Sequence, residues 1–184
     1  MISLIFEKDI FKVLTIFSLE PGARFKRADI KEKTLMNNVP LDNTLLKIVK
    51  SGFLKKEGKL YSVNFNDDTN KQILNNIQRQ YKYLKEIPLN IYFLLIDFIY
   101  SLNLSSIDIY LFGSYSKLIF KEGSDVDIAM VGAVKKDIIG KIVRKLEKKY
   151  KKTIEIHHFD KENFYKNKSD PLVKDIIKNG VRLA

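Results

Sequence analysis

The sequence predicts a mixed α/β (α+β) fold in two parts, a small helical part that ends in a β-hairpin and a small mixed sheet with helices. Three observations predict it. Apolar residues recur at helical spacing through most of residues 6–51. Residues 53–65 alternate on either side of the short polar segment "KEGK", as hairpins do. After residue 88, short alternating segments rich in β-branched and aromatic side chains are separated by helical patterns.

The composition indicates a globular chain with a strong positive charge. Its 184 residues are 45% hydrophobic and 30% charged, and the formal net charge is +11. That length suffices for one large domain or two small ones, each with its own core. The absence of cysteine excludes disulfides, thiolate zinc sites and a cysteine nucleophile. A partner or substrate rich in phosphate would account for the excess of lysine and arginine.

We expect neither a membrane span nor a secretory signal. The most lipid-like segment runs from Ile91 to Ile96, whereas a span needs about 20 apolar residues. Glu7, Lys8 and Asp9 interrupt the first apolar residues, and no small-residue cleavage site follows them. The sequence therefore predicts a cytoplasmic protein that does not contact a membrane.

The first part of the chain reads as three helices followed by a hairpin. The apolar positions after Phe6 recur at helical spacing until "EPG" at residues 20–22 stops the first helix. In the third helix we expect Leu45, Ile48 and Val49 to be buried. The hairpin forms on either side of "KEGK". The predicted helices are Phe6 to Leu19, about Lys26 to Lys33, and a third from Asn38 or Pro40 to Gly52, a residue suited to a left-handed cap.

This order of elements resembles a winged helix-turn-helix domain over residues 1–66. The resemblance rests on the element order and on the spacing of the apolar residues around Gly52. It implies that the third helix enters the major groove of DNA and that the hairpin wing contacts phosphates. Asp42 would face a phosphate-rich surface unfavourably, so the alternative is a domain that mediates dimerisation or docks on the other half of the chain. The implied DNA-binding residues are Asn38, Asn43, Lys47, Lys55, Lys56 and Lys59.

A polar segment separates the two parts. Residues 66–70, "NDDTN", favour the start of a helix, and we expect that helix to run from about Lys71 to Lys85 as a linker over residues 67–87. After Pro88 the sequence "LNIYFLLIDFIYSL" is too apolar to stand alone. We therefore expect this second helix to pack against the sheet of the last part, residues 88–184.

The segment "IDIYLFG" predicts a strand that ends at a tight bend. It alternates and is rich in β-branched and aromatic residues from about Ile107 to Phe112, and Gly113 and Ser114 end it. The following "SYSKLIF" begins with a hydroxyl residue and predicts a short helix. Because the first N–H groups of a helix have no partner within it, this corner is suited to bind phosphate.

The segment "SDVDIAMV" predicts a second strand with two carboxylates on one face. Side chains alternate along a strand, so Asp125 and Asp127 point the same way while Val126 and Ile128 point into the core. Carboxylates about 6 to 7 Å apart along a strand repel each other unless a positive charge lies between them. Magnesium prefers such oxygen ligands and often keeps phosphate as a further partner. The sequence therefore predicts a metal and phosphate site.

The bend and the carboxylates together carry a resemblance to a known family. The Gly-Ser pair at 113–114, ten intervening residues and the Asp-Val-Asp at 125–127 resemble the signature of the nucleotidyltransferase superfamily. That superfamily includes DNA polymerase beta and the minimal nucleotidyltransferases of prokaryotes. The resemblance spans residues 88–184 and implies a short mixed sheet with helices behind it. It also implies that Gly113 and Ser114 hold the β- and γ-phosphates of a nucleoside triphosphate, beside two Mg²⁺ ions.

The family needs a third carboxylate on a later strand, and "KTIEIHHFD" supplies it. In this strand Ile154 and Ile156 face inward while Glu155 lies on the other face. Glu155 would complete the metal site or act as the base for the incoming hydroxyl. The resemblance thus implies catalytic and metal-binding roles for Asp125, Asp127 and Glu155. The implied nucleotide-binding residues are Gly113, Ser114, Lys117 and Ser124.

Some residues depart from the family pattern or allow two readings. Lys117 stands where many small members carry an arginine, and it would contact phosphate as a point charge. Glu155 is one methylene longer than the more usual aspartate. His157 shares the face of Glu155 and could contact substrate or phosphate; alternatively it is a partly exposed strand residue. His158 faces the opposite way.

The resemblance implies metal-dependent transfer of a nucleoside monophosphate group from a nucleoside triphosphate to an acceptor hydroxyl of a protein or a nucleic acid. Small prokaryotic members of this kind include antitoxins that attach AMP to a tyrosine of a partner toxin. The run "KKDIIGKIVRKLEKKYKK", residues 135–152, holds nine lysines or arginines and two acidic residues, which would suit a nucleic acid or an acidic protein as the acceptor. Alternatively the run is a solvated helix face.

A different function is also compatible with the sequence. The chain would then be a DNA-binding transcriptional regulator, in which a catalytically inactive nucleotidyltransferase domain senses nucleotide. Either function is compatible with a homo-oligomer. Nucleotide transfer that depends on Asp127 would favour the enzyme, whereas salt-sensitive operator binding that survives loss of Asp127 would favour the regulator.

Overall fold

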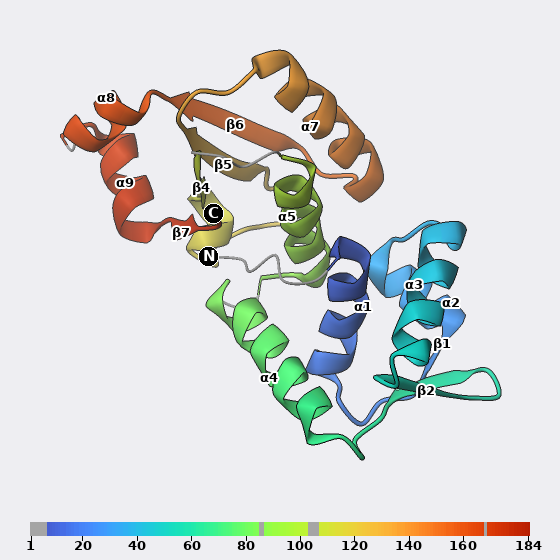
Figure 1. Ribbon diagram of the computed structural model, residues 1–184. Helices are drawn as coiled ribbons and strands as arrows, with labels where there is room; N and C mark the ends of the chain where they lie inside the picture. Colours follow the sequence, from blue (N-terminus) through green and yellow to red (C-terminus); the bar gives the residue numbers. More distant parts are fainter. Residues whose placement is uncertain (1–6, 85–86, 103–106, 168) are drawn as a thin grey trace. The chain divides into compact units, whose positions relative to one another are not determined.

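The computed structural model describes residues 7–84, 87–102, 107–167 and 169–184, and these residues form two compact units (Figure 1). The division falls between Phe93 and Leu94, inside helix α5 (Leu89–Ser101). We call the two the N-terminal unit and the C-terminal unit. Each combines helices with a sheet, so the predicted mixed α+β class is confirmed.

The N-terminal unit has the predicted order of helices followed by a hairpin. Strands β2 and β3 pair in antiparallel register around Gly58, and the short β1 adds to the free side of β3, giving the order β1-β3-β2. Phe6 and Lys85, where the sequence predicted helix ends, lie outside the described residues. The elements before α5 are α1 (Lys8–Leu19), β1 (Phe25–Lys26), α2 (Arg27–Thr34), α3 (Asn38–Lys50), β2 (Leu54–Glu57), β3 (Leu60–Val63) and α4 (Asp68–Tyr83).

Helix α3 shows how the core of this unit forms. Leu41, Leu45 and Ile48 are buried because their spacing places them on one side of the helix. The prediction that Val49 is buried is wrong, since Val49 is half-buried and the apolar stripe begins a turn earlier, at Leu41. Gly52 follows the helix with φ +77°, the left-handed conformation expected at that position.

The C-terminal unit is built around a mixed sheet. Within the described residues its strand order is β6-β5-β4-β7, with β5 and β6 parallel and the other neighbours antiparallel. The parallel pair is joined by α7, as parallel strands require a crossover. After α5 the elements are β4 (Asp108–Leu111), α6 (Gly113–Ser116), β5 (Val126–Val131), α7 (Lys136–Tyr150), β6 (Ile154–Phe159), α8 (Lys161–Lys166), α9 (Pro171–Asn179) and β7 (Val181–Arg182).

Helices α8 and α9 cover one face of this sheet. Phe164 of α8 and Ile176 of α9 are buried in a cluster with Phe112, Ala129 and Val131. Asp127 belongs to the same face as Ala129 and Val131, because side chains alternate along β5. Asp127 therefore lies on β5 next to the edge of this apolar cluster.

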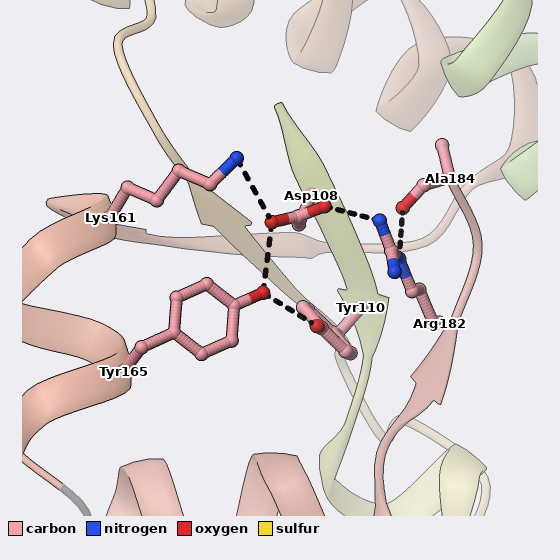
Figure 2. A network of polar contacts seen from close by, with 6 residues as sticks. All are labelled: Asp108, Tyr110, Lys161, Tyr165, Arg182 and Ala184. Atoms are coloured by element: carbon pink, nitrogen blue, oxygen red, sulfur yellow. Dashed lines mark hydrogen bonds and ion pairs between the residues drawn. The ribbon is translucent and has the colours of Figure 1, made fainter. Parts of the chain in front are cut away.

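A network of polar contacts surrounds Asp108, the first residue of β4 (Figure 2). The buried carboxylate of Asp108 accepts a hydrogen bond from the Tyr165 hydroxyl at 2.8 Å and another from the Arg182 guanidinium. The ammonium of Lys161 lies 3.8 Å from the same carboxylate, and the hydroxyls of Tyr110 and Tyr165 lie 3.1 Å apart. Burial and these hydrogen bonds raise the pKa of Tyr165 above its usual range. The network ties β4 to β7 and α8, away from the bend at the end of β4.

Candidate active site

The bend after β4 is pressed against a carboxylate. Gly113 has φ +68°, in the left-handed region that favours glycine. A Cβ atom at this position would overlap Oδ2 of Asp127 and lie 2.7 Å from its Cγ. The site therefore needs glycine for two reasons, the backbone conformation and the space that the Asp127 carboxylate occupies.

Backbone hydrogen bonds hold the bend and the start of β5 together. The Ser114 N–H donates to the Asp127 carboxylate, and the Phe112 N–H donates to the Asp127 carbonyl at 3.0 Å. Within the bend, the Ser116 hydroxyl donates to the Gly113 carbonyl at 3.1 Å. The position of Asp127 relative to the Gly-Ser bend is thus set by main-chain contacts.

The parallel register of β5 and β6 brings further polar side chains to Asp127. Asp127 pairs with Glu155, and Ala129 pairs with His157, so Asp127, Glu155 and His157 share one face of the sheet. One ligand atom from each of these residues lies within 4.8 Å of the ligand atoms of the other two. His157 Nε2 is 3.0 Å from Glu155 Oε1. We call Asp127, Glu155 and His157 the ligand cluster.

The ligand cluster concentrates negative charge. Asp127 is half-buried, and burial raises its pKa, as do the charges of Glu155 and Asp125. The His157 imidazole and the Ser114 N–H act in the opposite direction and favour the ionised carboxylate. A cation bound among these groups would relieve the repulsion that raises the pKa of Asp127.

The donor set fits a divalent metal ion. Carboxylate oxygens and an imidazole nitrogen are ordinary ligands of such ions. The side chains of Glu155 and His157 are 56% and 30% exposed, so an ion can reach them from solvent. The ligand types of Asp127, Glu155 and His157 therefore fit a divalent metal ion.

The predicted acidic residues are placed unequally. Asp127 and Glu155 lie together, as the alternation of their strands led us to expect. Asp125 is exposed and precedes β5; among the described residues it is not part of the ligand cluster, although its charge acts on Asp127. The third member of the ligand cluster is His157. The signal for it in the sequence was its position two residues after Glu155 on the same face.

The residues predicted to bind nucleotide also divide into two groups. Gly113 and Ser114 lie directly against Asp127. Lys117 instead forms an ion pair with Asp175 of α9, with 2.8 Å between Nζ and Oδ2. The Ser124 hydroxyl accepts a hydrogen bond from the Lys121 N–H at 2.8 Å and so stabilises the turn before β5.

On the N-terminal unit, the face of α3 predicted to contact DNA carries ion pairs. The Arg27 guanidinium binds Asp42 through two hydrogen bonds and also donates to the Asn38 side chain at 3.2 Å. Lys47 pairs with Glu7 at 2.8 Å. The pair with Glu7 offsets the positive charge of Lys47, and the pair with Arg27 offsets the negative charge of Asp42 on the same helix.

The positive charge of this unit gathers instead beside the hairpin. A hollow of about 430 Å³ lies between the start of α2 and the hairpin turn. Its lining includes Lys26, Arg27, Lys56 and Lys59, together with Tyr61. Lys56 lies over the Tyr61 ring, with Nζ 5.6 Å from the ring centroid. Of the residues predicted to bind DNA, Lys56 and Lys59 belong to this hollow.

Comparison with known proteins gives one family match. The family model described as "Nucleotidyltransferase domain" matches residues 94–183, which include the bend, the ligand cluster, α9 and β7. The match supports the predicted nucleotidyltransferase superfamily for this part of the chain. No curated protein matches the chain. None of the described helices combines the length and apolar character that crossing a membrane requires.

Proposed function

We propose that the protein is a metal-dependent nucleotidyltransferase, which moves a nucleoside monophosphate group from a nucleoside triphosphate to an acceptor hydroxyl. The match of residues 94–183 to a nucleotidyltransferase domain supports nucleotidyl transfer in general. The observation that carries the specific proposal is the contact of the Gly113 bend with Asp127, directly beside Glu155. In this proposal, the bend that binds phosphate and the carboxylates that bind metal are close enough to contact the same substrate molecule.

The residues have distinct roles in this proposal. Asp127 and Glu155 hold the divalent ions, with Asp125 contributing from the residue before β5, and Gly113 and Ser114 position the β- and γ-phosphates. When bound, two Mg²⁺ ions would stabilise charge on the attacking and leaving oxygens of an in-line displacement. Positioning and charge neutralisation carry most of such a reaction, so few other groups are needed.

The bonds that form and break are those of nucleotidyl transfer. A bond forms between the acceptor oxygen and the α-phosphorus, the bond from that phosphorus to the bridging oxygen breaks, and pyrophosphate leaves with the electron pair. If Glu155 acts as the base instead of completing the metal site, it accepts the hydroxyl proton, and its side chain is 56% exposed and therefore accessible to an acceptor.

Helix α7 supports a protein or nucleic acid as the acceptor. Its inner side buries Ile139, Leu146 and Tyr150, and its outer side carries exposed cations. The helix ends shortly before Glu155, and the Glu147 carboxylate holds the start of β6 by accepting from the Ile154 N–H at 3.0 Å. An anionic acceptor could bind along these cations, on the same unit as Glu155. The exposed cations are Lys136, Lys141, Arg144, Lys145 and Lys148.

Label transfer tests the proposal. The purified chain is incubated with each labelled nucleoside triphosphate, Mg²⁺ and a cell lysate that supplies acceptors. We expect label in an acceptor with wild type and none with Asp127→Ala. Asp137→Ala is the matched control, because Asp137 is an exposed aspartate in the first turn of α7, and it should transfer label normally. Undiminished transfer by Asp127→Ala would overturn the proposal.

The cationic hollow of the N-terminal unit favours a second candidate function, DNA binding by a winged helix. Lys26, Arg27, Lys56 and Lys59 around Tyr61 offer phosphate contacts and a ring. If the chain is a regulator with an inactive nucleotide-sensing domain, DNA binding should be salt-sensitive and unchanged in Asp127→Ala. Wild-type DNA affinity in a Lys56→Ala, Lys59→Ala double variant would exclude this surface.

A further inference from the structure

We propose that His157 is a direct ligand of the divalent cation, and that its imidazole makes the site prefer a transition-metal ion over Mg²⁺. The inference deepens the proposed function and rests on it for the presence of a metal, but it concerns which metal the chain selects. In this ligand set, the imidazole of His157 replaces one carboxylate of the acidic set Asp125, Asp127 and Glu155.

The donor atoms of the ligand cluster lie close to one another. Donors bound about 2.1 Å from a shared ion lie about 3 to 4.2 Å apart. The donor atoms of Asp127, Glu155 and His157 lie within 4.8 Å of one another, so small side-chain rotations bring them onto one ion. The exposure of Glu155 and His157 allows such rotations.

The surroundings keep the imidazole beside Asp127. The Phe112 ring meets the His157 ring edge-on, with centroids 5.1 Å apart and an interplanar angle of 78°. The register of β6 against β5 sets the distance between His157 and Asp127. Asp127 in turn is held by the bend at Gly113. The cluster is thus supported on strands rather than on a loop, which suits a ligand set.

The nitrogen donor determines the kind of ion. Mg²⁺ prefers oxygen ligands and often keeps its waters, whereas imidazole nitrogen favours first-row transition metals. Two carboxylates and one imidazole therefore select Co²⁺ or Zn²⁺, and to a smaller degree Mn²⁺, more strongly than three carboxylates would. Mn²⁺ is the probe of choice, because it can take the place of Mg²⁺ among carboxylates and phosphates and its electron spin detects nitrogen ligands.

A purely orienting role for His157 is the alternative. In that case the imidazole donates a hydrogen bond to Glu155 across the observed 3.0 Å and never contacts the ion. Glutamine separates the two roles, since its amide can still donate to Glu155 but offers the metal no nitrogen ligand. His158 gives a matched control, because it is the next residue on β6 and faces the other side of the sheet.

The experiment measures metal binding without substrate. Mn²⁺ and Mg²⁺ affinities are determined by calorimetry for wild type, His157→Gln and His158→Gln, and pulsed electron paramagnetic resonance of bound Mn²⁺ records coupling to ¹⁴N. We expect wild type to bind Mn²⁺ more tightly than Mg²⁺, and this preference to fall by about tenfold or more in His157→Gln. The ¹⁴N coupling should vanish in His157→Gln and persist in His158→Gln.

The outcomes separate this inference from the transferase proposal. Unchanged Mn²⁺ affinity in a folded His157→Gln, or ¹⁴N coupling that is absent in wild type, would overturn the ligand role of His157 even if Mg²⁺-dependent label transfer is normal. Conversely, a His157-dependent Mn²⁺ site in a chain that transfers no nucleotide would uphold the metal preference and contradict the transferase.

Discussion

At the scale of single residues, Gly113 couples backbone conformation to the position of a carboxylate. Its φ of +68° and the absence of a side chain allow Asp127 to lie directly against the bend. The same contact fixes Asp127 opposite Glu155 on the neighbouring strand. A change at Gly113 should therefore act on the chemistry through Asp127.

Gly113→Ala should lower nucleotide transfer by at least about a hundredfold, because the new Cβ displaces the Asp127 carboxylate and misplacements of about 1 Å are that costly. The left-handed conformation alone should cost about 1 to 2 kcal/mol of stability. Gly58→Ala is the control, since Gly58 has φ +59° and a Cβ there meets no described heavy atom within 4 Å. Thermal unfolding should show similar losses for both variants. Full transfer activity in Gly113→Ala would contradict the account.

The site residues differ in how far the sequence could predict them. Asp127 and Glu155 could be predicted because alternation along a strand assigns a face from local sequence. Alternation likewise placed His157 on the face of Glu155, but the closeness of both residues to Asp127 depends on the register between β5 and β6, which local sequence does not give. Lys117 was predicted to contact phosphate, but its ion pair with Asp175 joins residues far apart in sequence. Local patterns hold no information about such a pairing.

At the scale of elements, the same ion pair links the bend to a closing helix. Lys117 follows α6, and Asp175 lies in α9. The hydrogen bond from Lys117 lowers the pKa of Asp175, and a hydrogen bond from Asn179 adds to this effect. The pair therefore contributes to holding α9 beside the loop that carries the Gly-Ser bend.

Asp175→Asn should destabilise the protein at neutral pH and have no effect in acid. Because the folded pKa of Asp175 lies below its unfolded value of about 3.9, the ionised carboxylate stabilises the fold above that value. This contribution is lost as the pH falls through the folded pKa. Urea unfolding should give a difference of up to about 1 kcal/mol at pH 7, the range of exposed pairs. A difference that is the same at pH 2.5 would contradict this reading.

Helices of several turns and strands beside clear turn signals could be predicted, whereas β1 and α8 could not. Helices α1, α3, α4 and α7 span several turns, so their apolar period is visible in the sequence. Strand β1 has two residues and α8 has six, too few for a period to show. Both form because neighbours support them: β1 pairs with β3, and α8 buries Phe164 against the sheet.

At the scale of the whole molecule, two surfaces carry groups of cations in a chain of net charge +11. One is the hollow beside the hairpin in the N-terminal unit, and the other is the outer side of α7 in the C-terminal unit. The family match covers residues 94–183 and therefore includes α7 but not the hollow. The two surfaces can be tested separately by neutralising each.

We expect two triple variants to have different effects. Replacing Lys141, Lys145 and Lys148 with glutamine should lower label transfer to anionic acceptors, and if these lysines contact phosphates the salt slope of nucleic acid binding should fall by about 2 to 3. Replacing Lys55, Lys56 and Lys59 with glutamine should weaken DNA binding and leave label transfer unchanged. Filter binding and label transfer at several salt concentrations check both variants. Normal label transfer by the α7 variant together with reduced label transfer by the hairpin variant would contradict the proposed roles of the two surfaces.

Glu155 gives the most direct test of the claim that carboxylates from two strands meet at the Gly-Ser bend to transfer nucleotide. Pyrophosphate release and acceptor labelling are measured for wild type and Glu155→Gln at saturating Mg²⁺, with thermal unfolding as the check on the fold. The account predicts that turnover falls at least about a hundredfold while the unfolding temperature stays close to that of wild type, because Glu155 is exposed. Wild-type turnover in Glu155→Gln would contradict it.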